Sequence, residues 1–520
     1  MDTKALRQKI LDLAIRGKLV PQDPNDEPAS VLLERIRAQK QQMVREGKLK
    51  SKDIKDDTVI FVGEDNLYYE KLADGTVKCI EEEIPFDVPK GWLWARIFSI
   101  ADDLPYGTAK KSEKEGKLVV LRMGNIQSGE IDYNDLVYSS DEEDIARYSL
   151  IPGDLLFNRT NSAEWVGKTA IYRGDVPCIY AGYLIRVRTH INAEYLNAVM
   201  NSGYAKDYCN SVKTDGVNQS NINAQKLGAF LVPIPPIKEQ LRIDAYIAKA
   251  LPHVQAIGQN KADIAALVSL TKSKILDLAV HGQLVPHNPN DEPASVLLDR
   301  IRAEKKELVK QGIIKQDKRE SGIFLGEDNS YYLKQGDHVE AVDSQFLFDL
   351  PDGWSWCLLP NISHSELGKT LDQAKNTGDL HPYLRSVNIR WDEVDLSDVN
   401  QMRFEPEEMD RYTITKGDLL ICEGGDVGRS AIWISDNDIL YQNALHRVRF
   451  WGGINPRFFM YYMMFYESKG IIKDICKGVT IKHLTGNVLN SIPFALPPVD
   501  EQIAIVAKID EAFKLLNTIL

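Results

Sequence analysis

The sequence lacks the motifs that mark most enzyme active sites. No G-x-G-x-x-G, H-E-x-x-H or G-x-S-x-G pattern occurs in its 520 residues, which excludes the commonest dinucleotide sites, zinc proteases and serine hydrolases. The Gly-Lys-Thr triplets at 167–169 and 368–370 are not phosphate loops, because the residue five places before each glycine is a serine. An Asn/Asp-Pro-Pro-Tyr/Phe sequence, typical of amino-methyltransferases, is also missing. We therefore predict that the chain is not an enzyme.

The sequence also has few cysteines and no long apolar run. Its six cysteines show no Cys-x-x-Cys spacing and its nine histidines form no cluster, so we predict neither a metal site nor a disulfide framework. The densest apolar run, 458–466, is far shorter than the roughly 20 residues of a membrane span. The first residues do not have the apolar core of a signal peptide. We expect free thiols and a cytoplasmic protein.

An excess of positive charge, the usual mark of nucleic-acid binding, is lacking as well. The net charge of −12 argues against a generic nucleic-acid binder, although the distribution of charge matters more than its sum. Acidic residues gather in 50–83 (10 against 5 basic) and in 130–147 (7 against 1). Stretches 105–122 and 457–483 each have 5 basic residues against 2 acidic. Two interpretations stay open: a locally basic face, or a solvated mixture of charges.

What the sequence does have is an internal repeat. Lys9–Lys40 and Lys274–Lys305 are identical at 25 of 32 positions, and 24–33 is identical to 289–298. Looser matches continue the repeat: 86–94 with 348–356, 153–156 with 417–420, 166–171 with 427–432, and 235–240 with 497–502. A repeat of this length determines the architecture, and it predicts a pseudo-symmetric molecule.

The repeat divides the chain into five segments. We predict N-terminal helices and a connector in 1–83, a first α/β domain in 84–235, central coiled-coil helices and a connector in 236–345, a second α/β domain in 346–497 and a C-terminal helix in 498–520. The terminal helices correspond to the two ends of the central block. We therefore expect an α/β fold class: two α/β domains joined by long antiparallel coiled-coil helices in a pseudo-two-fold circular arrangement. A tandem duplication without closure is the alternative.

The central helix has the clearest periodicity. Apolar residues dominate an a/d seam: Val254, Ile257, Lys261, Ile264, Val268, Thr271, Ile275 and Leu278. Pro252 is expected to break or kink this helix from the preceding segment, 237–250. Similar stripes near both termini favour an antiparallel coiled coil within the chain over intermolecular pairing. We expect Ile264 to be buried in it, so that Ile264→Asp disrupts the coiled coil.

A second helix follows each copy of the repeat, with Pro28 and Pro293 in its first turn. Leu32, Ile36 and Met43 form its apolar edge in the first copy. It could be a purely structural helix. The near-identity of this segment, beside only loose similarity of the α/β domains, instead favours a docking surface. Two equal surfaces would bind two copies of one partner.

The two α/β domains are predicted to share a scaffold. Strands are expected at 118–121, 154–157, 179–187 and 440–450, helices at 195–204 and 458–470, and core tryptophans at Trp92, Trp94, Trp354 and Trp356.

Polar loop tips differ between the two domains: 158–162 faces 421–426, 216–222 faces 478–484, and 121–127 faces 384–390. Amide, Arg, Lys and Glu side chains match donor and acceptor patterns on base edges, although merely solvated tips are the alternative. Three such loops in each domain favour recognition. The candidate DNA-binding residues are Lys110, Lys111, Arg122, Asn125, Gln127, Asn158, Arg159, Thr160, Asn161, Ser162, Lys168, Lys213, Asn218, Gln219, Ser220, Asn221, Arg385, Asn388, Arg390, Glu423, Arg429, Lys477, Thr480, Lys482 and His483.

With these features the chain resembles the specificity subunit of a type I restriction–modification system. Each domain leads into a Pro-Pro-x-x-Glu-Gln helix start, at 235–240 and 497–502. The paired Ile-Leu-Asp-Leu-Ala…Gly-x-Leu-Val-Pro segments and the circular layout also fit. Asn158–Ser162 with Val166–Thr169, and Gln219–Ile222, look like this family's recognition domain. The resemblance covers essentially the whole chain.

The resemblance implies a non-catalytic subunit that binds double-stranded DNA. Each α/β domain would be a target-recognition domain that reads one half of a bipartite, asymmetric site in the major groove. The coiled coil would set the unread spacer, with half-sites near one helical turn apart. The implied partners are two methyltransferase (modification) subunits and the restriction/translocase subunits. No cofactor is expected in this chain; S-adenosylmethionine is expected in the modification subunit, and Mg and ATP in the restriction subunit.

Two other functions stay open at this point. One is a stand-alone DNA-modifying enzyme, which the missing motifs disfavour. The other is a protein–protein scaffold with duplicated binding domains, which the acidic net charge keeps open.

Overall fold

The computed structural model describes residues 2–162, 165–216, 219–312, 314, 321–342, 348–372, 376–476 and 483–519. The chain forms two compact units, Met1–Asn260 and Lys261–Leu520. This division follows the sequence repeat. Among the described residues, no helix combines the length and the apolar character needed to cross a membrane.

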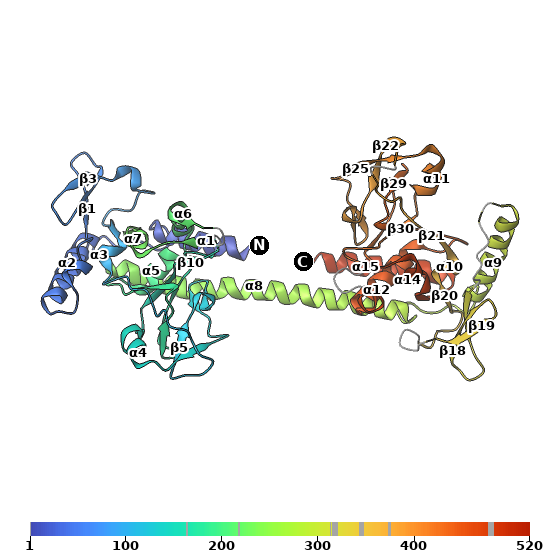
Figure 1. Cartoon of the computed structure of the whole chain (residues 1–520), viewed down its shortest axis with the longest axis horizontal. Helices are drawn as coiled ribbons and strands as arrows, with labels where there is room; N and C mark the ends of the chain where they lie inside the picture. The colour runs from blue at the N-terminus through green and yellow to red at the C-terminus, as the bar shows by residue number, and fades with distance from the viewer. Residues whose placement is uncertain are drawn as a thin grey trace. The chain divides into compact units, whose positions relative to one another are not determined.

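Unit 1 contains helices α1 (Thr3–Ile15), α2 (Ala29–Arg45), α3 (Ile97–Ile100), α4 (Glu142–Tyr148), α5 (Ala193–Met200), α6 (Gly203–Val212) and α7 (Ala224–Gly228). Its strands are β1 (Val59–Val62), β2 (Tyr68–Lys71), β3 (Val77–Cys79), β4 (Leu93–Arg96), β5 (Leu118–Leu121), β6 (Ile126–Gln127), β7 (Glu130–Ile131), β8 (Val137–Ser139), β9 (Leu155–Asn158), β10 (Thr160–Asn161), β11 (Thr169–Ile171), β12 (Cys178–Tyr180), β13 (Leu184–Val187), β14 (Thr214–Asp215), β15 (Ser220–Asn221) and β16 (Leu231–Ile234). Helix α8 (Ile237–Val280) begins in unit 1 and ends in unit 2 (Figure 1).

Unit 2 contains helices α9 (Ala294–Lys310), α10 (Leu359–Ile362), α11 (Met409–Tyr412), α12 (Pro456–Ser468), α13 (Ile471–Ile475), α14 (Gly486–Ser491) and α15 (Val499–Asn517). Its strands are β17 (Ser321–Leu325), β18 (Tyr331–Gln335), β19 (His338–Ala341), β20 (Ser355–Leu358), β21 (Ser363–Leu367), β22 (Asp379–Leu384), β23 (Ile389–Arg390), β24 (Glu393–Val394), β25 (Asn400–Phe404), β26 (Thr413–Ile414), β27 (Leu419–Cys422), β28 (Ser430–Ile432), β29 (Ile439–Tyr441), β30 (Leu445–Phe450) and β31 (Pro493–Leu496).

Each unit holds one α/β head built on the same plan. We call the part from β4 to β16 head 1 and the part from β20 to β31 head 2. Sheets β11-β9-β13, β12-β5-β8 and β16-β4 of head 1 recur in head 2 within β21-β30-β27-β28, β25-β22-β29-β26 and β20-β31. In both heads one pair is parallel, β12 with β5 and β29 with β22. The predicted α/β fold class, with two domains joined by a long helix, is confirmed.

The predicted elements are present, but three of the expected segments divide. Stretch 179–187 forms β12 and β13 because the chain turns at Ala181 and passes from β5 to β9, which belong to different sheets. Stretch 440–450 divides into β29 and β30 for the same reason. The helix expected at 195–204 ends at Met200, and the Ser202 side chain caps α6. The four predicted core tryptophans are buried, and all six cysteines are free thiols.

The terminal helices pack along α8, each within its own unit (Figure 1). In unit 1, Leu11 of α1 is buried and lines one cavity with Ala248 and Leu251 of α8. In unit 2, Lys272 Nζ of α8 donates to Asn517 Oδ1 of α15 at 2.6 Å. The repeat predicted both of these helix pairs, α1 with α8 and α15 with α8. Closure of the two units into a ring stays a prediction.

Two expectations for α8 were wrong. Pro252 does not break the helix, which is continuous from Ile237 to Val280. A proline removes one N–H donor, and α1 packs beside this stretch of α8. Ile264 is exposed rather than buried, and so is Ile257, whereas Val254 and Val268 are buried. The reason is geometric: α1 begins opposite Gly258 and α15 ends opposite Lys272, so Ile264 lies between these points.

The Pro-Pro-x-x-Glu-Gln motifs fix each head to the start of its helix. Gln240 Oε1 accepts from the backbone N of Asn192, and Gln240 Nε2 donates to the carbonyl of Pro235. Gln502 makes the same two bonds, with Asn455 and Pro497. Because the asparagines cap α5 and α12, one buried amide joins the helix start, the strand before it and a head helix.

Two glycines show why the repeated helix ends are conserved between the copies. Gly17 follows α1 with φ +63°, and Gly282 follows α8 with φ +65°. This left-handed conformation favours glycine at a helix end. A Cβ there would lie 2.4 Å from Pro89 Cγ or 2.5 Å from Pro351 Cγ. No other residue type fits this contact without a shift of the head.

A buried ion pair ties the sheet β1-β2-β3 to head 1. Both carboxylate oxygens of Glu70 accept hydrogen bonds of 3.0 Å from the Arg96 guanidinium. Burial alone would raise the pKa of Glu70, but the hydrogen bonds from Arg96, Thr58 and Lys78 and the charge of Arg96 together outweigh it and hold the pKa at about 2. Unit 2 has Leu333 and Leu358 at the matching positions, so this pair belongs to unit 1 alone.

Replacing Leu276 by Ala should lower the free energy of unfolding by about 3 kcal/mol, because Leu276 is only 4% exposed in the core of unit 2. The matched control, Leu270→Ala on the same helix, should change it by less than about 0.5 kcal/mol, because Leu270 is 67% exposed. Urea unfolding monitored by circular dichroism measures both. Equal effects of the two substitutions would contradict this packing of α8.

Acid should weaken unit 1 through Glu70. Its folded-state pKa of about 2 lies below the value of about 4.3 for an unfolded chain, so the ionised carboxylate stabilises the fold above pH ~4.3. This stabilisation is lost as the pH falls from there towards about 2. Glu70→Gln should flatten that part of a pH–stability profile, whereas Glu64→Gln, at an exposed turn, should leave it unchanged. An unaltered profile for Glu70→Gln would contradict the assignment.

Candidate nucleic-acid interface

An arginine–asparagine turn follows β5 in head 1. The side chain of Asn125 is buried; its Oδ1 accepts from the backbone N of Arg122, and its Nδ2 donates to the carbonyls of Asp132 and Asn134. The Arg122 guanidinium bonds the Asp135 carbonyl at 2.7 Å and its carboxylate at 3.0 Å. These bonds hold the turn, and they leave Asn125 with no exposed polar atom to offer a ligand.

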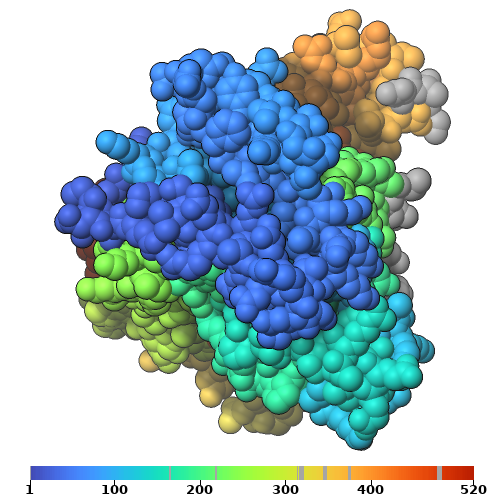
Figure 2. All heavy atoms as spheres, turned by 90° about the vertical axis from the view of Figure 1, so that its left-hand side faces the viewer, coloured from blue at the N-terminus to red at the C-terminus, as the bar shows by residue number. Residues whose placement is uncertain are grey.

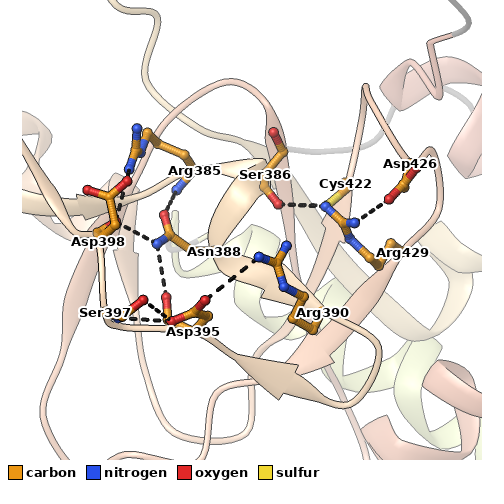
Figure 3. Close-up of polar contacts among 10 residues, drawn as sticks. All are labelled: Arg385, Ser386, Asn388, Arg390, Asp395, Ser397, Asp398, Cys422, Asp426 and Arg429. Atoms are coloured by element: carbon orange, nitrogen blue, oxygen red, sulfur yellow. Dashed lines mark hydrogen bonds and ion pairs between the residues drawn. The ribbon is translucent and has the colours of Figure 1, made fainter. Parts of the chain in front are cut away.

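The same turn recurs after β22 in head 2, as Figure 3 shows. Asn388 Oδ1 accepts from the backbone N of Arg385, and its Nδ2 donates to the carbonyls of Asp395 and Asp398. The Arg385 guanidinium bonds Asp398 through its carbonyl and its carboxylate. Four of the predicted DNA-binding residues, Arg122, Asn125, Arg385 and Asn388, make the hydrogen bonds that hold these turns.

The side chains presented by this turn differ between the heads. In head 1, Gln127 Oε1 accepts from Lys168 Nζ at 3.2 Å, and Lys168 lies over the ring of Trp165. In head 2 the matching residues are Arg390 and Arg429. Arg429 donates to the Ser386 carbonyl at 3.0 Å and pairs with Asp426, whereas the exposed Arg390 has its carboxylate partner, Asp395, 3.7 Å away (Figure 3).

Arg390 and Arg429 line one cavity of head 2. The cavity has a volume of about 670 Å³, and Trp391, Asp426 and Lys473 also line it. It combines an indole, three cationic side chains and two carboxylates, those of Asp426 and Glu467. Such a wall suits a planar or anionic group with hydrogen-bond acceptors. We call Arg390 and Arg429 the arginine pair of head 2.

The loops that follow β9 and α6 come together in head 1. Strands β10, β15 and β14 form one small sheet, in which Thr160 is opposite Asn221. The backbone N of Ile222 donates to the Arg159 carbonyl at 2.9 Å. In head 2 the corresponding bond joins Leu484 N to the Glu423 carbonyl at 2.8 Å. Both heads therefore bring the same pair of loops side by side.

Not all polar residues of these loops can contact a ligand. Asn158, Thr160 and Ser220 are buried; Thr160 accepts from Asn221, and Ser220 donates to Asp215. Ser162 and Gln219 are exposed, and Asn161 is half-exposed. Arg159 stacks on Tyr106 with 4.6 Å from its guanidinium carbon to the ring centroid. Lys213 donates to Asn210 at 3.3 Å beside this sheet.

The four candidates Asn218, Lys477, Thr480 and Lys482 lie outside the described residues. His483 is exposed, and its ring lies close to Gly424, beside the β27 loop that holds Glu423. His483 therefore lies beside the β27 loop, as the repeat predicts.

The basic stretch 105–122 does not form a basic face. Lys110 pairs with Asp141 at 2.7 Å, Lys117 pairs with Glu142, and Arg122 pairs with Asp135. The hydrogen bond to Asp141 raises the pKa of Lys110. The acidic stretch 130–147 thus neutralises its basic neighbour, and of the two earlier interpretations the charge mixture fits this region. Lys111 is exposed.

Sequence reasoning missed the aspartates and tryptophans of the site. Asp135 and Asp398 each follow their arginine by 13 residues, a repeated spacing that could have identified the turn. Trp165 and Trp391 occupy unmatched positions in the repeat, so no sequence signal marked them. Within the described part of the chain, no group of His, Cys, Asp and Glu is arranged to hold a metal ion.

Comparison with known proteins gives consistent matches. A family model for the type I restriction modification DNA specificity domain matches residues 351–520. The EcoAI type I restriction enzyme specificity subunit of Escherichia coli is 28% identical over 570 aligned residues, which cover 99% of this chain and 89% of that protein. The EcoEI specificity subunit, also from Escherichia coli, is 24% identical, with 98% and 89% covered.

The fold has a counterpart among solved structures. One chain of a type I R-M system structure superposes with a TM-score of 0.51 at 16% identity, covering 84% of this chain and 93% of the other. At this level of identity the likeness concerns the fold, and it agrees with the two-head plan.

Asn125→Ala and Asn388→Ala should each lower the free energy of unfolding by about 2 kcal/mol, because each leaves two carbonyls of a turn without their donor. The control Gln219→Ala, at an exposed loop position, should stay within about 0.5 kcal/mol of wild type. Urea unfolding measures all three. Asparagine variants as stable as the control would show that these residues do not hold the turns.

Proposed function

We propose, for a chain that belongs to the family of type I restriction–modification specificity subunits, that its two heads read the two halves of a bipartite, asymmetric DNA site. Both specificity-subunit relatives align with nearly the entire chain, which supports the transfer of this role. The single observation that carries the proposal is the pair of arginine–asparagine turns. Equivalent residues make four of the five hydrogen bonds in each turn, and the fifth runs from the asparagine amide to the Asn134 carbonyl in head 1 and to the Asp398 carbonyl in head 2. The side chains that the two turns present differ.

The chemistry of the presented side chains favours different bases for the two heads. An arginine can donate two parallel hydrogen bonds to guanine O6 and N7, whereas a glutamine pairs with adenine N6 and N7. Head 2 has the exposed Arg390 at the position where head 1 has the half-exposed Gln127, whose amide bonds the Gly124 carbonyl and Lys168. The exposed Ser162 and Gln219 and the half-exposed Asn161 add further donors and acceptors to head 1. Half-sites of different sequence follow from this difference.

Phosphate contacts supply affinity in DNA binding, and they require cations that are free to meet them. Lys111 is exposed, whereas Lys473, which lines the cavity beside the arginine pair, lies 3.3 Å from the Glu467 carboxylate. Since many other cations of the heads are held by carboxylates, we expect a modest phosphate contribution from this chain. Partner subunits would supply the remaining contacts with the DNA backbone.

The proposal extends to partners and cofactors. Two methyltransferase (modification) subunits and the restriction/translocase subunits would assemble on this chain in the cytoplasm. The chain itself would carry no catalysis and no cofactor; S-adenosylmethionine would bind the modification subunit, and Mg and ATP the restriction subunit. The coiled-coil stretch of α8 would set the spacer between the half-sites.

Arg390→Ala should weaken binding to the specific duplex about tenfold or more and relax base choice within one half-site only. The control Lys416→Ala removes an exposed cation of the same head that pairs with Asp436 outside the site, and it should bind as wild type does. Fluorescence anisotropy measures the affinities, with the modification subunit present and with duplexes substituted at each position.

Two outcomes would contradict the proposal. One is an Arg390→Ala variant that relaxes both half-sites or neither of them. The other is a wild-type complex whose DNA affinity does not change with salt concentration, since phosphate contacts make such affinities salt-dependent. A protein-only scaffold would give the second result.

A further inference from the structure

DNA reading by the heads leaves the most strongly repeated part of the chain without a role. This part is the segment that leads into α2 and α9, where Pro24–Leu33 and Pro289–Leu298 are identical. In unit 1, α2 lies beside the sheet β1-β2-β3, at the left of Figure 1 and on the face shown in Figure 2. A groove of about 500 Å³ runs between them. In unit 2, a groove of about 510 Å³ lies between α9 and the sheet β17-β18-β19.

The two grooves are built from equivalent residues. Several equivalent positions recur in both linings, among them Leu33 and Leu298, Arg37 and Arg302, Ile60 and Ile323, Trp94 and Trp356, and Ser99 and Asn361. Each pair comes from the same element of the repeat: helix, first strand, head strand or the short helix after it. Equivalent linings in two units that differ elsewhere indicate that both grooves accept the same occupant.

Buried contacts hold the helix wall of each groove in place. Lys40 on α2 is fully buried; its Nζ donates to the Phe98 carbonyl at 2.6 Å and pairs with Asp57 at 2.7 Å. Lys305 on α9 donates to the Pro360 carbonyl at 2.6 Å, the equivalent position. Burial lowers the pKa of Lys40. The grooves are therefore preformed, which reduces the entropic cost of binding.

The first strand of each small sheet is fixed in the same way. Ser99 Oγ donates to the Thr58 carbonyl in unit 1, and Asn361 Nδ2 donates to the Ser321 carbonyl in unit 2. Strands β1 and β17 are both edge strands, since each pairs with only one described strand. Helix and strand walls thus have matching supports in the two units.

The floor of each groove is apolar. Trp94 and Trp356 are buried, and they pack edge-on against Phe86 and Phe348, with ring centroids 5.0 Å apart in both cases. On the strand next to the groove, Phe61 and Phe324 are exposed; each stacks on a tyrosine of the neighbouring strand. Exposed aromatic residues at matching places mark a surface for apolar contact.

The helix rim is basic. Arg37 of unit 1 is exposed, and Lys71 lines the opposite side of the same groove. In unit 2, the lining of the groove contains Arg302, Lys306 and Lys310. The Arg302 guanidinium pairs with Asp299. Two carboxylates also line the first groove, those of Glu34 and Asp57. The Asp57 carboxylate is neutralised by its ion pair with Lys40. A basic rim on a chain of net charge −12 favours an acidic ligand.

We propose that each groove binds the same peptide segment of a protein partner that is present in two copies. The segment has an apolar side chain that enters between Leu33 and Trp94, or Leu298 and Trp356, next to a carboxylate that meets Arg37 or Arg302. This inference rests on the proposed function, which supplies two identical partner subunits. A nucleic-acid backbone would meet the basic rim but would gain nothing from the apolar floor, so a peptide fits better.

Arg37→Glu and Arg302→Glu test the grooves with the modification subunit as the probe. Native mass spectrometry should show two bound copies on the wild-type chain, one on either single variant and none on the double variant. The control double variant, Arg35→Glu with Arg300→Glu, makes the same charge change on the same helices but outside both linings, and it should keep two copies. Circular dichroism checks that every variant is folded.

Binding of DNA by each complex separates this inference from the function on which it rests. Two copies on the double variant would overturn the groove assignment even if DNA binding is normal. A double variant that keeps two copies but loses DNA affinity would show that the grooves contact phosphate instead, which also overturns it. A wild-type complex with two copies that does not bind DNA would refute the proposed function and leave the grooves supported.

Discussion

The buried amides of Gln240 and Gln502 determine how each head sits on its helix. Each side chain joins the end of a head strand, the cap of a head helix and the first turn of a long helix. A recognition domain on a helical spacer is useful only if its orientation is constant. Loss of one such amide would leave a part-buried backbone N–H and a buried carbonyl without a hydrogen-bond partner, so the contact is costly to break. Everything that the heads present to a ligand depends on this orientation.

The heads keep one scaffold and vary what it presents. The arginine–asparagine turn recurs with the same five kinds of hydrogen bond, and the paired loops after β9 and β27 meet their partner loops through the same backbone bond. At the matching positions beside the turn, Gln127 and Lys168 of head 1 are replaced by Arg390 and Arg429 in head 2. This separation of support from readout lets one fold accept different half-sites, and it makes sequence specificity a local property of few residues.

The repeat predicted the architecture well because it is a property of the whole chain. It identified the two units, the pairing of the terminal helices with α8 and the matching loops. Burial along α8 could not be predicted from periodicity, since Ile264 has the right spacing but lies between the ends of α1 and α15. Composition could not show that Asp141 and Asp135 neutralise the basic stretch, because these ion pairs depend on tertiary contacts. Polar residue type could not distinguish Asn125, which holds a turn, from Gln127, which is presented by it.

The central claim is that each head independently reads one half of the site. The most direct measurement is methylation mapping in cells that carry the partner subunits and a chain in which residues 84–235 are replaced by a copy of 346–497. With two identical heads, the account predicts that the methylated sequence becomes symmetric, with the half-site of head 2 on both sides of the spacer. An unchanged asymmetric sequence would contradict it.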